Sequence, residues 1–225
     1  MDINLNYIEK GEGKPLVLLH GNGGSLDCFK HQIEYFSQFY RVIAIDTRGH
    51  GKSPMGTKPF TIVQFSEDLK DFLDEHGLKR IYLLGFSDGG NIALTFALKY
   101  PEYIEKLISN GANIFPNGLK ASCLIPIKIN YFLTGLLSGI NKKALKKHKL
   151  LGLMTNEPNI TFDELKTIKI PTLVIVGTVD MIKHSHSVAI ANALPNSKFI
   201  ALKGGHGIVH DTPKQFNKAV HDFIT

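Results

Sequence analysis

The stretch GFSDGG at residues 85–90 decides the fold of this chain. An apolar run at 80–86 leads into it, and a helix-forming run at 91–98 follows it directly. A strand that turns at once into a helix strains the residue at its apex, and glycines two positions to either side keep Cβ atoms out of the tight turn. This G-x-S-x-G pattern predicts that Ser87 is a nucleophile. The alternative, a turn packed by glycines with no chemical role, fits the strand–turn–helix context less well.

The rest of the chain alternates strand-like and helix-like segments. Apolar runs rich in β-branched residues are typical of parallel strands buried on both faces, and they occur at 16–19, 41–46, 80–86, 104–109, 171–177 and, more weakly, 198–202. Apolar residues recur at helical spacing over 62–73 and 216–224. Capping boxes that would begin helices are predicted by the pairs Thr61–Gln64, Thr161–Glu164 and Thr212–Gln215. The alternation predicts an α/β fold with a doubly wound, mostly parallel sheet, formed by residues 1–225 as a single domain.

The composition excludes several classes of protein. With 43% apolar residues and a formal net charge of +6 over 225 residues, the chain is too apolar and too weakly charged to be disordered. Its two cysteines, Cys28 and Cys123, predict neither a disulfide framework nor a zinc site. The N-terminus shows no signal peptide, and no uncharged apolar stretch reaches the roughly 18 residues that span a bilayer. We therefore expect a cytoplasmic protein.

One segment, 112–167, interrupts the alternation of strands and helices. It contains an apolar part, 124–137, and then a lysine-rich part, and we interpret it as a short helical lid inserted into the sheet domain. Residues 112–156 include seven lysines and no acidic residue, so the remainder of the chain carries a formal net charge of only −1. The lysines raise the alternatives of nucleic-acid or membrane association. We favour a solvated lid face, and we expect no nucleic-acid partner and no stable membrane insertion.

A second glycine-rich turn, HGNGG at residues 20–24, follows the first apolar run. Glycines there allow a backbone N–H to point towards the nucleophile, as a serine hydrolase requires for its oxyanion hole. We assign the two oxyanion donors to the backbone N–H groups of Asn22 and Asp88. A flexible loop is the alternative. A phosphate-binding loop is a weaker one, because neither of the glycine-rich phosphate motifs is present.

A nucleophilic serine needs an acid and a histidine later in the chain. Asp180 and His206 each follow a predicted strand, and catalytic groups of open α/β sheets gather at the carboxyl ends of strands. His210 is a rival for the base, but His206 is flanked by glycines and follows its strand directly. Asp46 also ends a strand and is a candidate acid, although the chain order favours Asp180.

These motifs together resemble the α/β-hydrolase family over nearly the whole chain: HGNGG, DTRGHGKS, GFSDGG, the acid after VIVGTVD, and GGHG. The stretches GFSDGGNIAL, KYPEYI, GAN and FNKAVHDFI are most similar to the valacyclovir hydrolase (biphenyl hydrolase-like) branch. The N-terminus departs from the family by lacking one of its leading strands, and the lid is short and lysine-rich. Haloalkane dehalogenases and epoxide hydrolases of this fold carry an aspartate where this chain has Ser87, so we exclude both activities.

The resemblance and the motifs imply a serine hydrolase that cleaves a small carboxylic ester, with lactones, thioesters and amides as less favoured substrates. Ser87 would attack the carbonyl, His206 would carry the proton, and Asp180 would orient the histidine. No metal or organic cofactor is implied. The alternative from another class is a non-catalytic small-molecule binding or signalling protein on a hydrolase scaffold.

The side chain of Asp88, next to the nucleophile, has two interpretations. It could line the acyl pocket and favour substrates with a cationic group, such as amino-acid esters. The resemblance to the valacyclovir hydrolase branch implies substrates of the same kind. It could instead pack against the start of the helix, where a carboxylate is favoured by the helix dipole. The sequence leaves the two open, as it leaves open the substrate and the oligomeric state.

Overall fold

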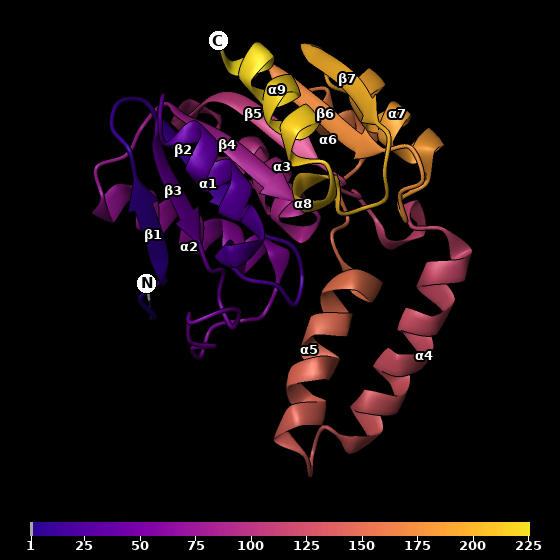
Figure 1. Ribbon diagram of the computed structural model, residues 1–225. Coiled ribbons are helices and arrows are strands. Elements are labelled where there is room, and N and C mark those ends of the chain that lie inside the picture. Colours follow the sequence, from indigo (N-terminus) through magenta and orange to yellow (C-terminus); the bar gives the residue numbers. More distant parts are fainter. Residues whose placement is uncertain (1) are drawn as a thin grey trace.

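A computed structural model describes residues 2–225 and contains a seven-stranded sheet (Figure 1). The strands are β1 Tyr7–Lys10, β2 Pro15–Leu19, β3 Arg41–Ile45, β4 Ile81–Phe86, β5 Ile104–Asn110, β6 Thr172–Gly177 and β7 Ser197–Leu202. Their order across the sheet is β1-β3-β2-β4-β5-β6-β7, and every neighbouring pair is parallel except the antiparallel pair β1 and β3. The predicted doubly wound α/β fold is therefore confirmed.

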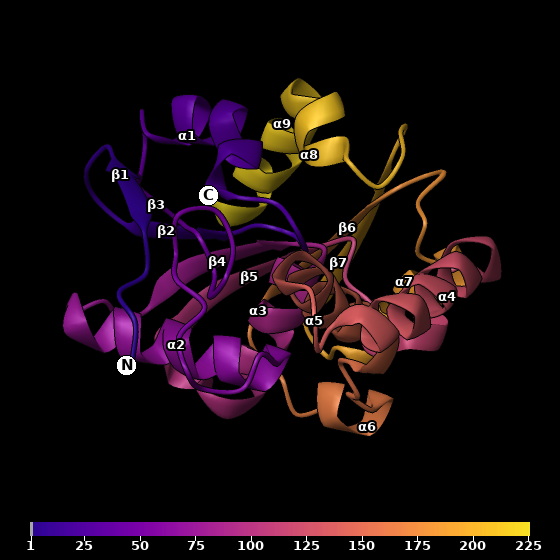
Figure 2. The same cartoon turned by 90° about the horizontal axis from the view of Figure 1, so that it is seen from below.

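Helices cover both faces of the sheet (Figure 2). They are α1 Lys30–Phe36, α2 Ile62–Glu75, α3 Asp88–Lys99, α4 Ala121–Leu137, α5 Lys142–Asn156, α6 Phe162–Leu165, α7 His184–Ala193, α8 Ile208–Asp211 and α9 Pro213–Ile224. Three short 3₁₀ turns are described as well, at Leu26–Phe29, Pro101–Tyr103 and Pro116–Gly118. One apolar layer lies between the sheet and α2, α3 and α7, and a second lies between the sheet and α1, α8 and α9. Both faces of the central strands are thus buried, as their continuous apolar runs predicted.

The strand that sequence reasoning missed is β1. Its four residues, Tyr7–Lys10, are all exposed, and the strand lies at the edge of the sheet, paired with β3. Because an edge strand needs little apolar character, its short and mixed sequence carries no strong strand signal.

The predicted helix starts are correct, but two of the three capping boxes are incomplete. Thr161 and Glu164 form the full reciprocal box at α6. At α2 the Thr61 hydroxyl accepts from the Gln64 backbone N–H, yet the Gln64 side chain donates to Asp68 instead of returning to the cap. At α9 the Thr212 hydroxyl makes no cap bond and donates to the Ile208 carbonyl, because the preceding turn of α8 places that acceptor within reach.

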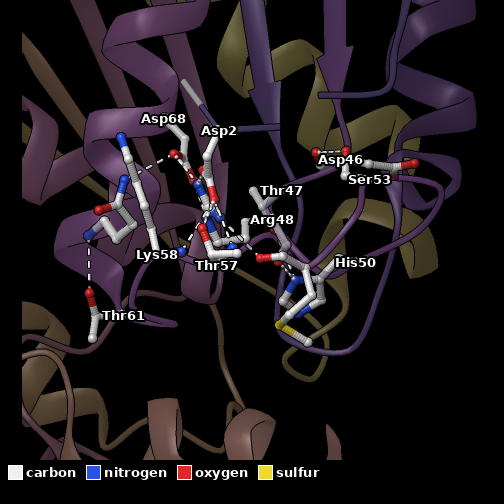
Figure 3. A network of polar contacts seen from close by, with 12 residues as sticks. Asp2, Asp46, Thr47, Arg48, His50, Ser53, Thr57, Lys58, Thr61 and Asp68 are labelled. Carbon is white, nitrogen blue, oxygen red and sulfur yellow. Dashed lines mark hydrogen bonds and ion pairs between the residues drawn. The ribbon is translucent and has the colours of Figure 1, made fainter. Parts of the chain in front are cut away.

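The loop after β3 is held by a buried ion pair (Figure 3). The Arg48 guanidinium, which is completely buried, donates two hydrogen bonds of 2.7 Å to the carboxylate of Asp68 on α2, and it also contacts Asp2. A bidentate pair of this kind fixes both side chains in one geometry. The loop thereby ties the N-terminus and α2 to the end of β3, so Arg48 has a structural role.

Helices α4 and α5 form an antiparallel hairpin that extends away from the sheet (Figure 1). They occupy 121–156 of the segment for which a lid was expected, whereas apolar residues on either side of them, Ile114, Ile160 and Leu165, are buried in the core. Within residues 2–225, no helix combines the length and the apolar character needed to cross a membrane.

Candidate active site

Ser87 lies at the sharp turn between β4 and α3, with backbone angles φ 55° and ψ −118°. Positive φ is rare for a residue with a side chain and stores strain. A Cβ atom at Gly85 would lie 2.1 Å from the Gly89 carbonyl oxygen, and one at Gly89 would lie 2.0 Å from the carbonyl oxygen of Leu19 on β2. Close backbone approach therefore requires both glycines, which is the steric reason predicted from the G-x-S-x-G pattern.

The three side chains chosen from the sequence lie in one hydrogen-bonded chain. The Ser87 hydroxyl is 2.8 Å from Nε2 of His206, and Nδ1 of His206 is 2.7 Å from Oδ1 of Asp180. Ser87 follows β4, Asp180 follows β6 and His206 follows β7, so parallel strands bring their carboxyl ends to one edge of the sheet. The strand order reverses at β2, beside β4, which is where ligands bind in open α/β sheets.

Asp180 is 4% exposed, and its Oδ1 also accepts the backbone N–H of Ile182 at 2.9 Å. Burial by itself raises the pKa of a carboxyl, but the hydrogen bond and charge of His206 outweigh it and hold the pKa of Asp180 below its usual range. Asp180 is therefore ionised at neutral pH. An ionised carboxylate can only accept, so the proton on Nδ1 of His206 points to Asp180 and leaves Nε2 free to accept from Ser87.

His20, which sequence reasoning did not single out, orients the loop after β2. Its Nδ1 donates to the Gly21 carbonyl at 2.7 Å, and its Nε2 accepts the Thr47 backbone N–H at 3.1 Å. This arrangement requires a neutral imidazole, and burial lowers the pKa of His20 accordingly. The Gly21 carbonyl and the Asn22 N–H belong to the same trans peptide and point in opposite directions. By holding the carbonyl, His20 sets the direction of the Asn22 N–H.

The same loop lies directly against Ser87. A Cβ atom at Gly21 would be 2.9 Å from Cβ of Ser87, so the backbone of residues 21 and 22 passes beside the Ser87 side chain. The Asn22 side chain donates to the Leu150 carbonyl at 2.7 Å, which links this loop to α5. Among the hydrogen bonds of residues 2–225, none uses the backbone N–H of Asn22 or of Asp88.

The Asp88 side chain is 7% exposed. Its Oδ1 accepts from the Asn91 side-chain amide at 3.1 Å, while its buried Oδ2 has no hydrogen-bond partner in the described structure. Burial raises the pKa of Asp88 to about 6, partly offset by the Asn22 amide and the charge of His206. One carboxylate oxygen thus packs against α3, and the other makes no hydrogen bond, so the Asn22 amide and the charge of His206 offset its burial only in part.

The rival residues lie elsewhere. Nδ1 of His210 is 2.6 Å from the Asp211 carboxylate on the surface, and His210 makes no hydrogen bond to Ser87 in the described residues. The Asp46 carboxylate accepts the backbone N–H groups of Leu26 and Lys52, at 2.8 and 2.9 Å. It therefore organises loops, whereas the carboxylate that contacts His206 is that of Asp180.

Gly111 is a second residue that sequence reasoning missed. It follows β5 with φ 61°, and a Cβ atom there would lie 3.0 Å from Cε1 of His206 and 3.5 Å from Oδ2 of Asp180. A side chain at this position would compete with the histidine for space. The resemblance in the GAN stretch was the one signal in the sequence that included Gly111. Its contact with His206 depends on β5 lying between β4 and β6, so local sequence does not reveal it.

No set of three or more His, Cys, Asp or Glu side chains in residues 2–225 is arranged to hold a metal ion.

The amino-acid sequence of this chain is similar to those of known hydrolases. Residues 14–132 match a family model described as the alpha/beta hydrolase fold. A putative carbamate hydrolase, RutD, from Caulobacter sp. strain K31 is 27% identical over 93% of this chain and 90% of its own length. Epoxide hydrolase 4 of Mus musculus is 40% identical, but over only 47% of this chain and 31% of its own length.

Solved structures agree on the fold. The enol-lactonase from Burkholderia xenovorans LB400 superposes with a TM-score of 0.83 and 22% sequence identity, covering 99% of this chain and 96% of the enzyme. The sheet order, the strained serine turn and a family match that spans more than half of the residues lead to one conclusion. The chain belongs to the alpha/beta hydrolase family and is an enzyme of that family.

Proposed function

We propose that this enzyme is a serine hydrolase that cleaves a small carboxylic ester through an acyl-enzyme intermediate. One observation carries the proposal, namely the continuous hydrogen-bonded chain from Ser87 through His206 to Asp180. A buried, ionised carboxylate, an oriented imidazole and a hydroxyl on a strained turn are the three groups that such chemistry needs.

The reaction proceeds in two halves. The Ser87 oxygen attacks the ester carbonyl as Nε2 of His206 takes its proton, and a tetrahedral oxyanion forms. His206 then returns the proton to the leaving alcohol, which leaves Ser87 acylated. A water molecule, deprotonated by His206, attacks the acyl group; the bond between the acyl carbon and the Ser87 oxygen then breaks, His206 returns the proton to Ser87, and the acid is released. Asp180 holds the imidazole and stabilises its protonated form throughout.

The oxyanion is stabilised by the backbone N–H groups of Asn22 and Asp88. The contact of Gly21 with Ser87, the orientation of the loop by His20 and the position of Asp88 at the N-terminus of α3 support this assignment. Preorganised donors of this kind cost no reorganisation as charge develops, and each contributes roughly 100- to 1000-fold in rate.

The substrate of the proposed reaction is a small carboxylic ester, and amino-acid esters are the favoured kind. The relative named a putative carbamate hydrolase supports cleavage at a carbonyl, and the sequence resemblance to the valacyclovir hydrolase branch favours amino-acid esters. The unpartnered Oδ2 of Asp88, close to Ser87 in the chain, supports that choice, because a substrate ammonium group would supply the partner that this oxygen lacks.

The decisive experiment compares Ser87→Ala with Ser66→Ala, a change at a fully buried serine on α2. With p-nitrophenyl acetate, Ser87→Ala should lower kcat by on the order of 10⁴–10⁶ and leave the melting temperature nearly unchanged. Ser66→Ala should keep full activity. Activity of Ser87→Ala within tenfold of the parent would refute the proposal. Absence of turnover in the parent, despite tight ligand binding, would favour the non-catalytic alternative.

Substrate preference is tested separately with Asp88→Asn. An α-amino ester and a neutral ester of similar size are compared. If Asp88 pairs with the substrate ammonium group, kcat/KM falls selectively for the amino ester, by roughly 1–3 kcal/mol. An equal loss on both esters would assign Asp88 to support of the turn instead, and would leave the role of Ser87 untouched.

A further inference from the structure

The side chain of Asn22 joins the loop after β2 to the hairpin. Its amide donates a hydrogen bond of 2.7 Å to the backbone carbonyl of Leu150, which lies inside α5. A carbonyl oxygen has two lone pairs, so it can take this donor in addition to its partner within the helix. The two residues are 128 positions apart in the chain, so only the tertiary structure brings them together.

The α5 end of this hydrogen bond is firmly attached to the sheet domain. Leu153, three residues further along the helix, is 1% exposed and packs in the apolar core. The carboxylate of Glu157, directly after α5, accepts the backbone N–H of Ile62 on α2 at 2.6 Å. Because this end of α5 is anchored independently, the hydrogen bond from Asn22 holds the loop against a fixed helix.

The residues that follow Asn22 give the loop little support of their own. Gly23 and Gly24 are exposed, and a Cβ atom at Gly23 would meet no atom of residues 2–225 within 4 Å. The Gly24 N–H bonds to the Gly21 carbonyl at 3.2 Å, but this bond lies within the loop itself. Glycine leaves a chain more conformational freedom than any other residue. The Asn22 amide therefore supplies an attachment that the glycines cannot.

The peptide between Gly21 and Asn22 is the part of the loop that this attachment orients. Rotation of a planar peptide about the axis between its two Cα atoms changes the direction of its N–H. On one side His20 holds the Gly21 carbonyl, and the backbone of Gly21 lies against Ser87. On the other side the bond to Leu150 holds the Asn22 residue. The peptide is thus restrained at both ends, and its N–H has one direction.

We propose that the side chain of Asn22 is a positioning residue for the oxyanion hole. By bonding to α5, it holds the backbone N–H of its own residue in the direction that the developing oxyanion requires. A displacement of about 1 Å at a reacting centre can lower a rate by roughly a hundredfold, so this support matters to catalysis. The inference rests on the proposed function, because an oxyanion forms only if Ser87 attacks a carbonyl carbon.

Asn22→Ala removes the side-chain bond and keeps the backbone N–H. With p-nitrophenyl acetate, kcat should fall by roughly ten- to a hundredfold, and KM should change by less than about threefold, because the lost support acts in the transition state. Asn22→Leu, which has a side chain of similar size and no donor, should lose as much. Parent activity in Asn22→Leu would mean that the shape of the side chain matters and its hydrogen bond does not, which would overturn the proposal.

The matched control is Asn159→Ala. The Asn159 amide also donates a hydrogen bond of 2.7 Å to a backbone carbonyl, that of Asn156, the last residue of α5. The variant therefore loses the same kind of bond from the same helix, at an exposed position. It should keep kcat within about twofold. An equal loss of kcat in Asn159→Ala and Asn22→Ala would assign the effect to the end of α5 and refute a role in positioning.

Inhibition by phenylboronic acid probes the oxyanion hole more directly. The Ser87 oxygen bonds to boron as its proton passes to His206, which gives an anionic tetrahedral adduct similar to the proposed intermediate. Asn22→Ala should weaken this inhibition by about the same factor, ten- to a hundredfold, by which it lowers kcat/KM. Unchanged inhibition beside a lowered kcat would place the effect outside the oxyanion hole and contradict the proposal.

A measurement on the free protein does not depend on catalysis. Nitrogen-15 relaxation should give the backbone N–H of residue 22 an order parameter of about 0.85 in the parent, and below about 0.6 in Asn22→Ala. Equal values would show that the side chain does not hold the peptide. Absence of ester turnover in the parent would overturn the proposed function and this inference together. Turnover in the parent that Asn22→Ala leaves intact would overturn this inference alone.

Discussion

The sheet domain and the α4–α5 hairpin follow opposite rules of construction. In the sheet domain polar groups are buried and paired, as Arg48 is with Asp68 and His206 is with Asp180. In the hairpin large apolar side chains such as Phe132 and Leu136 are exposed. A region that must hold reacting atoms within fractions of an ångström needs dense packing and paired polar groups, whereas an exposed apolar surface is suited to an external partner. The following predictions test this contrast, from the largest expected effect to the smallest.

The largest effect is expected where the sheet domain positions the base. If His206 is the base that we propose, His206→Ala should lower kcat by on the order of 10⁴, because Nε2 of His206 is the group that contacts the Ser87 hydroxyl. His210→Ala is the matched control and should keep kcat within about twofold, since His210 pairs with Asp211 on the surface. Steady-state kinetics on p-nitrophenyl acetate measures both. An inactive His210→Ala protein beside an active His206→Ala protein would reverse the assignment.

The buried ion pair should give the next largest effect. Arg48→Met leaves the Asp68 carboxylate, 1% exposed, without its partner and should lower the free energy of unfolding by about 3–5 kcal/mol. Urea denaturation measures the loss. The double variant Arg48→Met with Asp68→Leu removes both charges and should recover part of it. If the single change costs less than about 1 kcal/mol, the pairing that we ascribe to the sheet domain contributes little to its stability.

Asp88 should be an exception inside the sheet domain, because its charge is poorly compensated. Burial raises the pKa of Asp88 from its usual value of 3.8 to about 6 in the folded protein, so the native state binds the proton more tightly and stability falls as pH rises from about 4 to 6. Asp88→Asn should therefore stabilise the protein by about 2 kcal/mol at pH 8 and by little at pH 4. Urea denaturation at the two pH values gives the difference. A gain of the same size at both would mean that the carboxyl proton is not involved.

The smallest effect is expected in the hairpin. Leu136→Ala, at a position 67% exposed, should change the free energy of unfolding by no more than about 0.5 kcal/mol. The matched control is Leu94→Ala on α3, where the side chain is fully buried and the loss should be about 2–5 kcal/mol. Thermal or urea unfolding of the two variants compares them. A large loss for Leu136→Ala would show that the protein itself covers the side of α4 that carries Leu136.

Much of the sheet and the central side chains of the site could be predicted from sequence. The apolar runs placed six of the seven strands to within one or two residues. Five of them are largely buried, and such strands must be continuously apolar, whereas β7, the weaker run, lies at an edge of the sheet and is largely exposed. The edge strand β1 escaped because it is exposed. The triad geometry agrees with the residues selected, Ser87, Asp180 and His206, since steric demands of the turn and chain order are local properties of the sequence.

What the sequence determined by itself were the features set by local stereochemistry and by the parallel sheet: the strained turn at Ser87, and the gathering of the residues that follow β4, β6 and β7 at one edge. The tertiary structure alone decided the rest. His20 and Gly111 matter through neighbours distant in the chain, and the pKa of Asp88 depends on how completely its surroundings exclude water. The sequence of the apolar run 124–137 is equally compatible with a buried lid and with an exposed one. Only the packing around α4 shows that its outer side is left uncovered, because burial is a property of what surrounds a helix and not of the helix itself.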